Sequence, residues 1–309
     1  MEFNKTTILL ILVLTFSVSL SSQEITDKIP KHQIEFQHDN DFAMLTDRYY
    51  SSGLFLRYRR RLNKGIFTTG REQLTFELKQ LAHTPEDIGS TDLGFIDRPY
   101  AGYSGFSAGW SMSLKGGIIE TRLETGLTGP SSGAGSFQRW YHRAIVRYSE
   151  PTWFTEIEDS FHGNIYLTYT AEWELAPNPF SVHFAIRPEF AYGTKDIYAQ
   201  PEFLLYLGRR NPTGSSIANH QINSTQKEIF FRIRMAYRFV GHNAFLEGNA
   251  LGDNSLYTVE PNNKFVQWGF DVYHRFKQND YKFGIIALTR ESQAFNRHKY
   301  IVLAYARSF

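Results

Sequence analysis

Apolar and polar residues alternate with a period of two along much of this chain. Every odd position from 229 to 239 is apolar, and three arginines occupy even positions of the same segment. Successive side chains of a β-strand point to opposite faces, so the pattern predicts a strand with one apolar and one polar face. The same alternation runs through residues 165–175 and 266–272. One face suits lipid, and the other suits a polar interior.

Counting such segments predicts about twelve strands. They cover residues 33–42, 51–62, 71–81, 103–114, 118–127, 163–175, 180–191, 196–208, 227–245, 264–276, 280–290 and 298–309. A closed antiparallel barrel pairs all backbone groups and leaves no open edge in hydrocarbon. The prediction is therefore an all-β fold, a transmembrane antiparallel up-and-down β-barrel, with a short helix in an external loop.

The two ends of the chain indicate where this barrel resides. Residues 1–22 carry a lysine, an apolar run and small residues, which is typical of a secretory signal peptide. Residues 23–309 would then form the barrel. The last strand ends at Phe309, a terminal aromatic residue that resembles the insertion signal of bacterial outer-membrane proteins. We expect the protein in the bacterial outer membrane, surrounded by its lipid.

Composition narrows the function classes. The chain has no cysteine, which excludes disulfides and thiolate metal sites, and its net charge of +2 does not favour nucleic acid as a partner. Aromatic residues make up 16% of the chain and the mean hydropathy is −0.37. An outer-membrane barrel fits these values, although composition alone also fits a secreted β-sandwich. We expect a monomer.

The connections between strands alternate in length, which predicts their side of the membrane. Short turns of such barrels face the periplasm and long loops face outside. If the first strand runs outward, residues 38–53 and 128–162 lie at the same external rim. Because successive connections alternate between the two sides, this count (parity) places the segment 209–226 on the periplasmic side. The segment is an exception, since it is long. A helix is expected over 136–147, with Gln138 and His142 on one face.

The stretch 38–53 is dense in hard oxygen donors. Its oxygen-bearing side chains are Asp39, Asn40, Asp41, Thr46, Asp47, Ser51 and Ser52, and Arg48 lies among them. Carboxylate, amide and hydroxyl oxygens favour Ca²⁺ or Mg²⁺ over softer metals. The spacing does not match an EF-hand, so a solvated loop of Asx turns explains the stretch as well.

Two further positions could carry chemistry. His142 could act as a general base if another group holds its ring, although many histidines serve no such role. Arg98, in the motif 97–103, could pair with a phosphate or carboxylate at the rim, while the Arg98-Pro99 turn is also a sufficient structural reason for that motif. The chain carries no G-x-S-x-G, P-loop or H-E-x-x-H motif.

Four motifs in order resemble the outer-membrane lipid A 3'-O-deacylase family. They are residues 39–53, 97–102, 138–143 and 243–249. The resemblance implies a twelve-stranded barrel, a Ca²⁺-dependent esterase activity and lipid A as substrate. Carried over residue by residue, it assigns catalytic roles to Asn40, Ser51 and His142, metal binding to Asp41, and supporting roles to Gln138, Asp47, Arg48 and Arg98. Ser51 stands where the family more often has Thr, and Asp39 where it commonly has Glu.

The resemblance implies a hydrolase whose site faces the external leaflet. His142, oriented by Gln138, would activate water, and Ca²⁺ held by Asp41 would stabilise the oxyanion of an acyl ester. Ser51 as a covalent nucleophile is a variant of this mechanism. Two other functions remain open from the sequence: a passive pore or structural barrel without catalysis, and an outer-membrane phospholipase with a Ser-His-Asn/Asp site.

Overall fold

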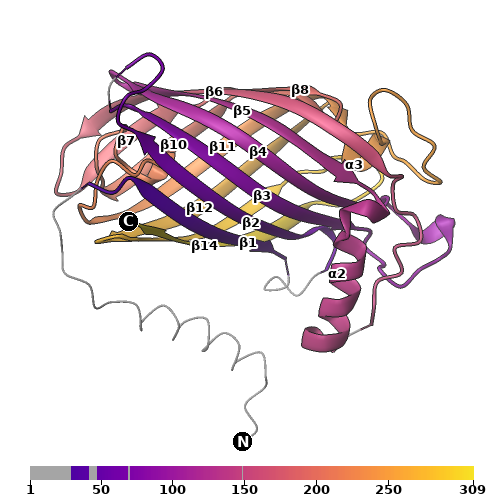
Figure 1. The fold of residues 1–309 in the computed structure, drawn as a ribbon. Coiled ribbons are helices and arrows are strands. Elements are labelled where there is room, and N and C mark those ends of the chain that lie inside the picture. The colour runs from indigo at the N-terminus through magenta and orange to yellow at the C-terminus, as the bar shows by residue number, and fades with distance from the viewer. Residues whose placement is uncertain (1–28, 42–46, 69, 148) are drawn as a thin grey trace, which may run out of the picture.

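The protein is a closed β-barrel with a short helix beside one rim (Figure 1). This computed structural model describes residues 29–41, 47–68, 70–147 and 149–309, so the expected signal peptide and Thr46 lie outside the described residues. The strands are β1 (His32–Asn40), β2 (Tyr49–Leu62), β3 (Glu72–Thr84), β4 (Ala101–Leu114), β5 (Gly117–Thr128), β6 (Ser160–Ala176), β7 (Ser181–Ile186), β8 (Glu189–Gly193), β9 (Asp196–Gln200), β10 (Glu202–Arg209), β11 (Glu228–Asn243), β12 (Lys264–Phe276), β13 (Asn279–Leu288) and β14 (His298–Ser308). The helices are η2 (Leu93–Phe95), η3 (Pro130–Ser132), α2 (Ala134–Tyr141), the π-helix η4 (His142–Val146), η5 (Ile217–Asn219) and α3 (Ala244–Glu247).

Fourteen strand segments make twelve barrel strands, as the sequence predicts. β7 and β8 both pair with β6 and are separated by Arg187 and Pro188, and β9 and β10 both pair with β11 and flank Pro201. Proline has no N–H for the ladder, so it divides these two strands without moving them out of the wall. β1 pairs with β14 from Gln33–Ser308 to Asn40–Ile301, which closes the barrel.

The two faces of the wall differ as the alternation predicts. Phe231, Ile233 and Phe270 are among many exposed apolar side chains on the outside. No helix among the described residues is long and apolar enough to cross a membrane.

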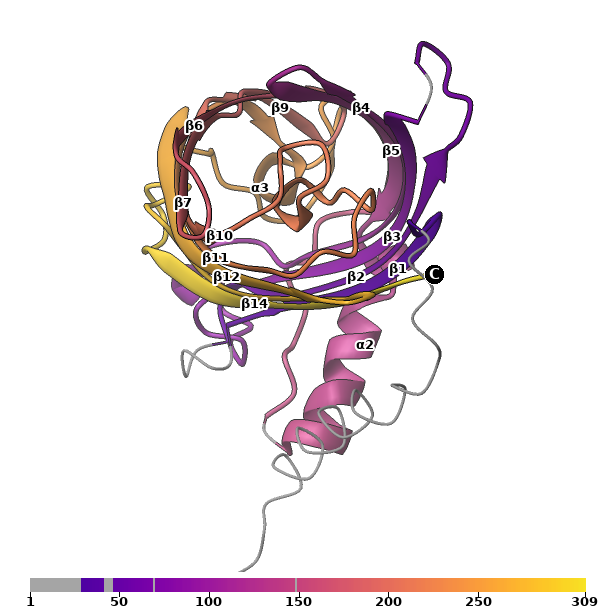
Figure 2. The ribbon, with the colours of Figure 1, turned by 90° about the vertical axis from the view of Figure 1, so that its left-hand side faces the viewer.

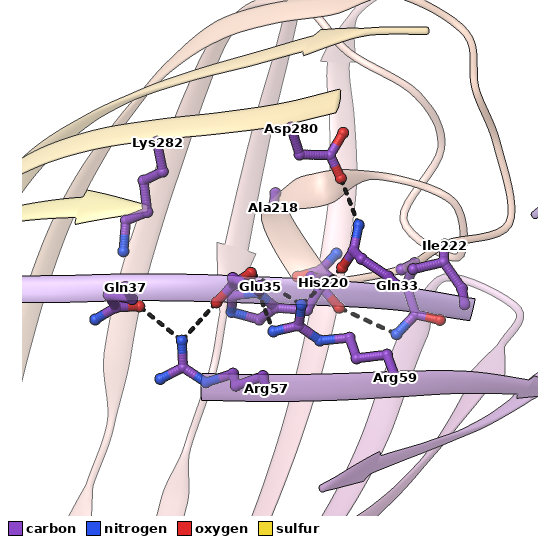
Figure 3. Close-up of polar contacts among 12 residues, drawn as sticks. Gln33, Glu35, Gln37, Arg57, Arg59, Ala218, His220, Ile222, Asp280 and Lys282 are labelled. Atoms are coloured by element: carbon purple, nitrogen blue, oxygen red, sulfur yellow. Dashed lines mark hydrogen bonds and ion pairs between the residues drawn. The ribbon is translucent and has the colours of Figure 1, made fainter. Parts of the chain in front are cut away.

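Ion pairs fill the lumen side of the wall. Arg57 bonds to Glu35 and Glu77, and Arg59 Nη1 lies 2.9 Å from Glu35 Oε2 (Figure 3). Arg232 Nη2 lies 2.7 Å from Asp271 Oδ2 across the lumen-facing side of β11 and β12. Pairing compensates the cost of burying these charges.

The segment 210–227, between β10 and β11, folds into the lumen at the barrel end opposite α2 (Figure 2). Arg210 Nη2 donates to Glu172 Oε2 at 2.7 Å, and Arg275 Nη2 donates to the Gln221 carbonyl at 2.9 Å. The Gln73 side chain donates to the carbonyl of His220 at 3.0 Å. We call this segment the lumen plug. Its length, which is unusual for a short-turn rim, is explained by its position inside the barrel.

The rim beside α2 holds the long connections. The ends of β1, β3 and β5 and the starts of β2, β4 and β6 meet there, so the stretch around Asn40 and the loop that carries α2 share one rim, as parity predicts. α3 enters the lumen at this end, where Leu246 packs with Tyr49 and Phe295. Both ends of the lumen therefore contain packed chain.

This packing predicts that the lumen of the wild-type barrel conducts few ions. Replacing residues 212–224 by a short Gly/Ser turn removes most of the lumen plug. Single-channel conductance in planar bilayers should rise severalfold, because the variant keeps α3 but loses the packing at the other end of the lumen, and a twelve-stranded barrel is wide enough for a water-filled path where its lumen is unpacked. The same replacement over residues 250–256, in an external loop, should leave conductance at the wild-type level. A wild-type barrel that already conducts as well as the shortened variant would contradict the prediction.

Candidate active site

A cavity of about 740 Å³ lies on the outer side of the barrel wall, between β1–β3 and α2. On β1, Gln37 and Asp39 point into the lumen and are buried, so His38 and Asn40 point outward. The site is therefore on the lipid side of the wall at the rim, not in the lumen. Its lining includes His38, Asn40, Asp41, Asp47, Arg48, Ser51, Leu54, Gln80, Glu86, Asp87, Phe137, Gln138, Tyr141, His142 and Ser149.

A bulge at the start of β2 shapes the wall side of this cavity. The register between β2 and β3 shifts between Tyr50 and Ser52, and Ser51 in the bulge is buried. The Asn40 amide donates to the Ser51 carbonyl at 3.1 Å. The Arg48 backbone N–H donates to Asp41 Oδ2 at 2.9 Å. These bonds hold the Asn40-Asp41 pair against the bulge.

Helix α2 forms the side of the cavity that faces the wall, and Gln138 connects the two. The Gln138 Nε2 lies 3.2 Å from Ser51 Oγ and 3.3 Å from Asp47 Oδ1, and donates to both. The Trp153 indole donates to Gln138 Oε1 at 2.9 Å. A buried amide with its donors and acceptor engaged has a fixed orientation, so Gln138 fastens α2 to the wall.

His142 follows one turn later on the same face and is buried. Its Nε2 lies 2.9 Å from Asp47 Oδ2, and its Nδ1 lies 2.8 Å from the Ser149 carbonyl. The hydrogen bond with the Asp47 carboxylate raises the pKa of His142 above its ordinary value. The sequence predicts that Gln138 orients this ring, but among the described residues its polar contacts are with Asp47 and Ser149. Gln138 is linked to the ring through Asp47, to which it donates.

The motif 97–103 packs against Trp153, the residue that holds Gln138. The Tyr100 ring stacks on Trp153 with ring centroids 5.0 Å apart, and the Tyr100 hydroxyl donates to the Ile88 carbonyl at 2.7 Å. Trp153, which holds Gln138, was not identified from the sequence. It lies in an irregular loop with a positive φ of 55°, and a lone Trp in such a segment gives no periodic signal.

The two supporting arginines lie in different places. Arg48 lines the cavity and forms an ion pair with Glu86. Arg98 is buried beside the lumen, where its Nη2 donates to the Phe245 carbonyl at 3.3 Å and its guanidinium lies over the Phe295 ring. Burial lowers the pKa of Arg98 to about 10. The structure thus engages Arg98 in rim packing, and it does not line the cavity.

The donors of the cavity suit a hard cation. Asp41, Asp47, Glu86 and Asp87 contribute carboxylates, whereas His38, Arg48 and His142 are the basic residues among the described lining. The described part of the chain contains no group of three or more His, Cys, Asp or Glu residues placed to hold a metal. A Ca²⁺ site would therefore combine Asp41 with amide and backbone oxygens, which Ca²⁺ accepts readily.

Comparisons with known proteins extend this description. The solved structure of LpxR from Salmonella typhimurium has a TM-score of 0.77 with 17% identity, covering 90% of this chain and 100% of that chain, and shows the same fold. The β-domain of the Bordetella autotransporter BrkA has a TM-score of 0.46 and 10% identity, covering 91% of this chain and 98% of that chain. No curated protein matches the sequence. The family model described as "Outer membrane protein LpxR" matches residues 8–306, so this chain belongs to the LpxR family of outer-membrane proteins.

Proposed function

We propose that the protein is an outer-membrane esterase that removes the ester-linked 3'-acyloxyacyl group of lipid A. The observation that carries the proposal is a series of polar contacts on the outer side of the wall: Gln138 donates to Ser51 and to Asp47, and Asp47 Oδ2 lies 2.9 Å from His142 Nε2. Lipid A is a membrane lipid, so its acyl esters lie beside the wall and not in the lumen. Membership of the LpxR family supports this assignment. The proposal includes action as a monomer, with the site facing the external leaflet.

His142 is the proposed general base. Because its Nδ1 faces the Ser149 carbonyl, Nδ1 carries the proton and Nε2 is the basic nitrogen. Nε2 points toward Asp47, which is itself bonded through Gln138 to Ser51, so it faces the cavity. When the ring is protonated, its Nε2–H faces the Asp47 carboxylate. After Nε2 has lost this proton to solvent, it takes a proton from a water molecule, and the oxygen of that water attacks the ester carbonyl. The proton then passes to the sugar oxygen that leaves.

The wall side of the cavity would position the ester. Asp41, with oxygens of Asn40 and the neighbouring backbone, would hold Ca²⁺, which when bound stabilises negative charge on the carbonyl oxygen. The Arg48 N–H fixes the Asp41 carboxylate, and Asn40 is fixed on the Ser51 carbonyl. Both residues are thereby oriented before substrate enters, which reduces the reorganisation that the reaction requires.

The other two functions have less support. A passive pore is disfavoured because the lumen plug and α3 pack inside the barrel. A phospholipase with a serine nucleophile needs Ser51 in contact with its base. In the part of the chain that the structure describes, the Ser51 hydroxyl bonds to Gln138 and has no hydrogen bond to His142.

The first test is the mass of lipid A from cells that express the protein. The wild type should reduce the mass by one acyloxyacyl group, and His142→Ala should lower this conversion at least about 100-fold, because a general base contributes about that much. Arg143→Ala is the matched control, since Arg143 is exposed on the same helix and pairs with Glu150. Unchanged lipid A with the wild type would refute the proposed activity.

The pH profile tests the contact between His142 and Asp47. The base must be neutral, and its pKa is raised by Asp47, so the rate should rise with pH through a value above the ordinary 6.5. Asp47→Asn removes the carboxylate, which should lower the pKa and move the acidic limb to lower pH, while reducing the maximal rate about tenfold or more. An acidic limb at the same pH in both proteins would show that Asp47 does not act on the base.

Removal of the cation tests the role of Asp41. A chelator should abolish deacylation by the purified protein and added Ca²⁺ should restore it. Asp41→Asn should raise the Ca²⁺ concentration needed for half-maximal rate by about tenfold or more, because it removes a charged oxygen ligand. Serving as a control, Asp92→Asn alters an exposed carboxylate near η2, outside the cavity lining, and should leave this concentration unchanged. Full activity in the chelator would exclude the cation.

A further inference from the structure

A second depression lies on the outer wall next to the candidate active site, on the side away from the α2 rim. It has a volume of about 570 Å³ and runs across β1 to β6. Its lining is mostly apolar and includes Phe36, Leu54, Leu56, Leu78, Gln80, Ser104, Phe106, Thr125, Leu127 and Phe161. We call it the wall trough. Pockets for drug-sized ligands have volumes of ~300–1,000 Å³, so this volume can hold an extended organic chain.

The strand register shows how the wall trough is built. Leu54, Gln80, Ser104, Leu127 and Phe161 form one row of paired residues across β2–β6. The next row, two residues further from the α2 rim, contains Phe36, Leu56, Leu78, Phe106 and Thr125. Residues two apart on a strand share a face, so both rows point outward into the membrane.

Small residues form the floor of the trough and large ones form its sides. Phe161 is 69% exposed and Leu78 is 56% exposed, so both stand out from the wall. Between them, Ser104 Oγ donates to the Ser132 carbonyl at 2.6 Å and Thr125 Oγ1 donates to the His162 carbonyl at 3.0 Å. Because these hydroxyls are bonded to backbone, the floor presents carbon to whatever lies in the trough.

The trough is continuous with the catalytic cavity. Leu54 and Gln80 line both. Gln80 also donates to Ser104 Oγ and to the Ser132 carbonyl, so the junction is fixed to the segment that precedes α2. From Leu54 to Leu56 the trough leads away from His142, toward the middle of the wall. An acyl ester whose carbonyl lies in the cavity would thus have its chain directed along this surface.

We propose that the wall trough binds the fatty acyl chain whose ester is cleaved, and that it selects the length of that chain. This inference rests on the proposed esterase function and adds a binding site to it. An acyl chain fits better than an ordinary annular lipid because the trough begins at the cavity that contains His142 and Asp47. Apolar contacts of the chain with the two rows would supply the binding energy.

The test fills the trough without altering the cavity. Thr125→Phe places a ring on the floor, next to Gly163, where a Cβ would have open space. Thr121→Phe is the matched control, since Thr121 faces outward on the same strand but lies outside the trough. Rates are measured in detergent micelles with two synthetic acyl glucosamine esters, one with a long chain and one with a short chain.

Thr125→Phe should reduce the ratio of long-chain to short-chain rates about tenfold, the lower range of discrimination by an apolar pocket. Thr121→Phe should keep the wild-type ratio. Equal ratios in all three proteins would overturn the inference while leaving the esterase function intact. A wild type that hydrolyses neither ester would instead refute the proposed function.

A binding measurement decides the matter independently of activity. The chain has no cysteine, so Thr125→Cys and Thr121→Cys each provide a single site for an environment-sensitive fluorophore. Addition of purified lipid A should shift the emission of the label at 125 and not of the label at 121. An equal shift with phospholipid alone, or no shift at 125, would show that the trough holds ordinary membrane lipid or nothing, and would overturn the inference.

Discussion

Closure of the sheet is the constraint on which the rest of the structure depends. The pairing of β1 with β14 removes the last unpaired edge, so every strand is fixed in register relative to its neighbours. Register then decides which side chains face lipid and which face the lumen. Asn40 points outward because Asp39 points inward. The location of the candidate site on the outer side of the wall follows from the alternation of single residues along β1.

The lumen shows how the barrel tolerates its many charged residues. Inward carboxylates such as Glu35 and Asp271 lie against arginines of neighbouring strands, and the lumen plug adds Arg210 to Glu172. Removing one partner from such a pair would leave an uncompensated buried charge, which is costly. The network therefore fixes strand neighbours and seals the lumen by the same contacts. The lumen is thus filled by structural ion pairs, whereas the candidate active site lies on the outer side of the rim.

Much of the fold could be predicted from the sequence, because the two-residue period reports directly on the two faces of a strand. The twelve strands and the shared rim of the 38–53 stretch and α2 followed from that period and from parity. The lumen position of 210–227 could not be predicted, since it depends on contacts such as Arg275 with Gln221. Likewise, the contact of Asp47 with His142 joins a loop to a helix far along the chain, and only the packed structure reveals it. The bulge at Ser51 changes register by one residue, which no alternation pattern resolves.

The position of the cavity on the lipid side of the wall determines how a substrate would be supplied. A molecule that enters between the wall and α2 arrives by diffusion within one leaflet, not from the aqueous phase. Its effective concentration is then a mole fraction of the membrane surface. Dilution by other lipids would slow encounter even when the total amount of substrate is constant, and the composition of the surrounding leaflet would become a kinetic variable.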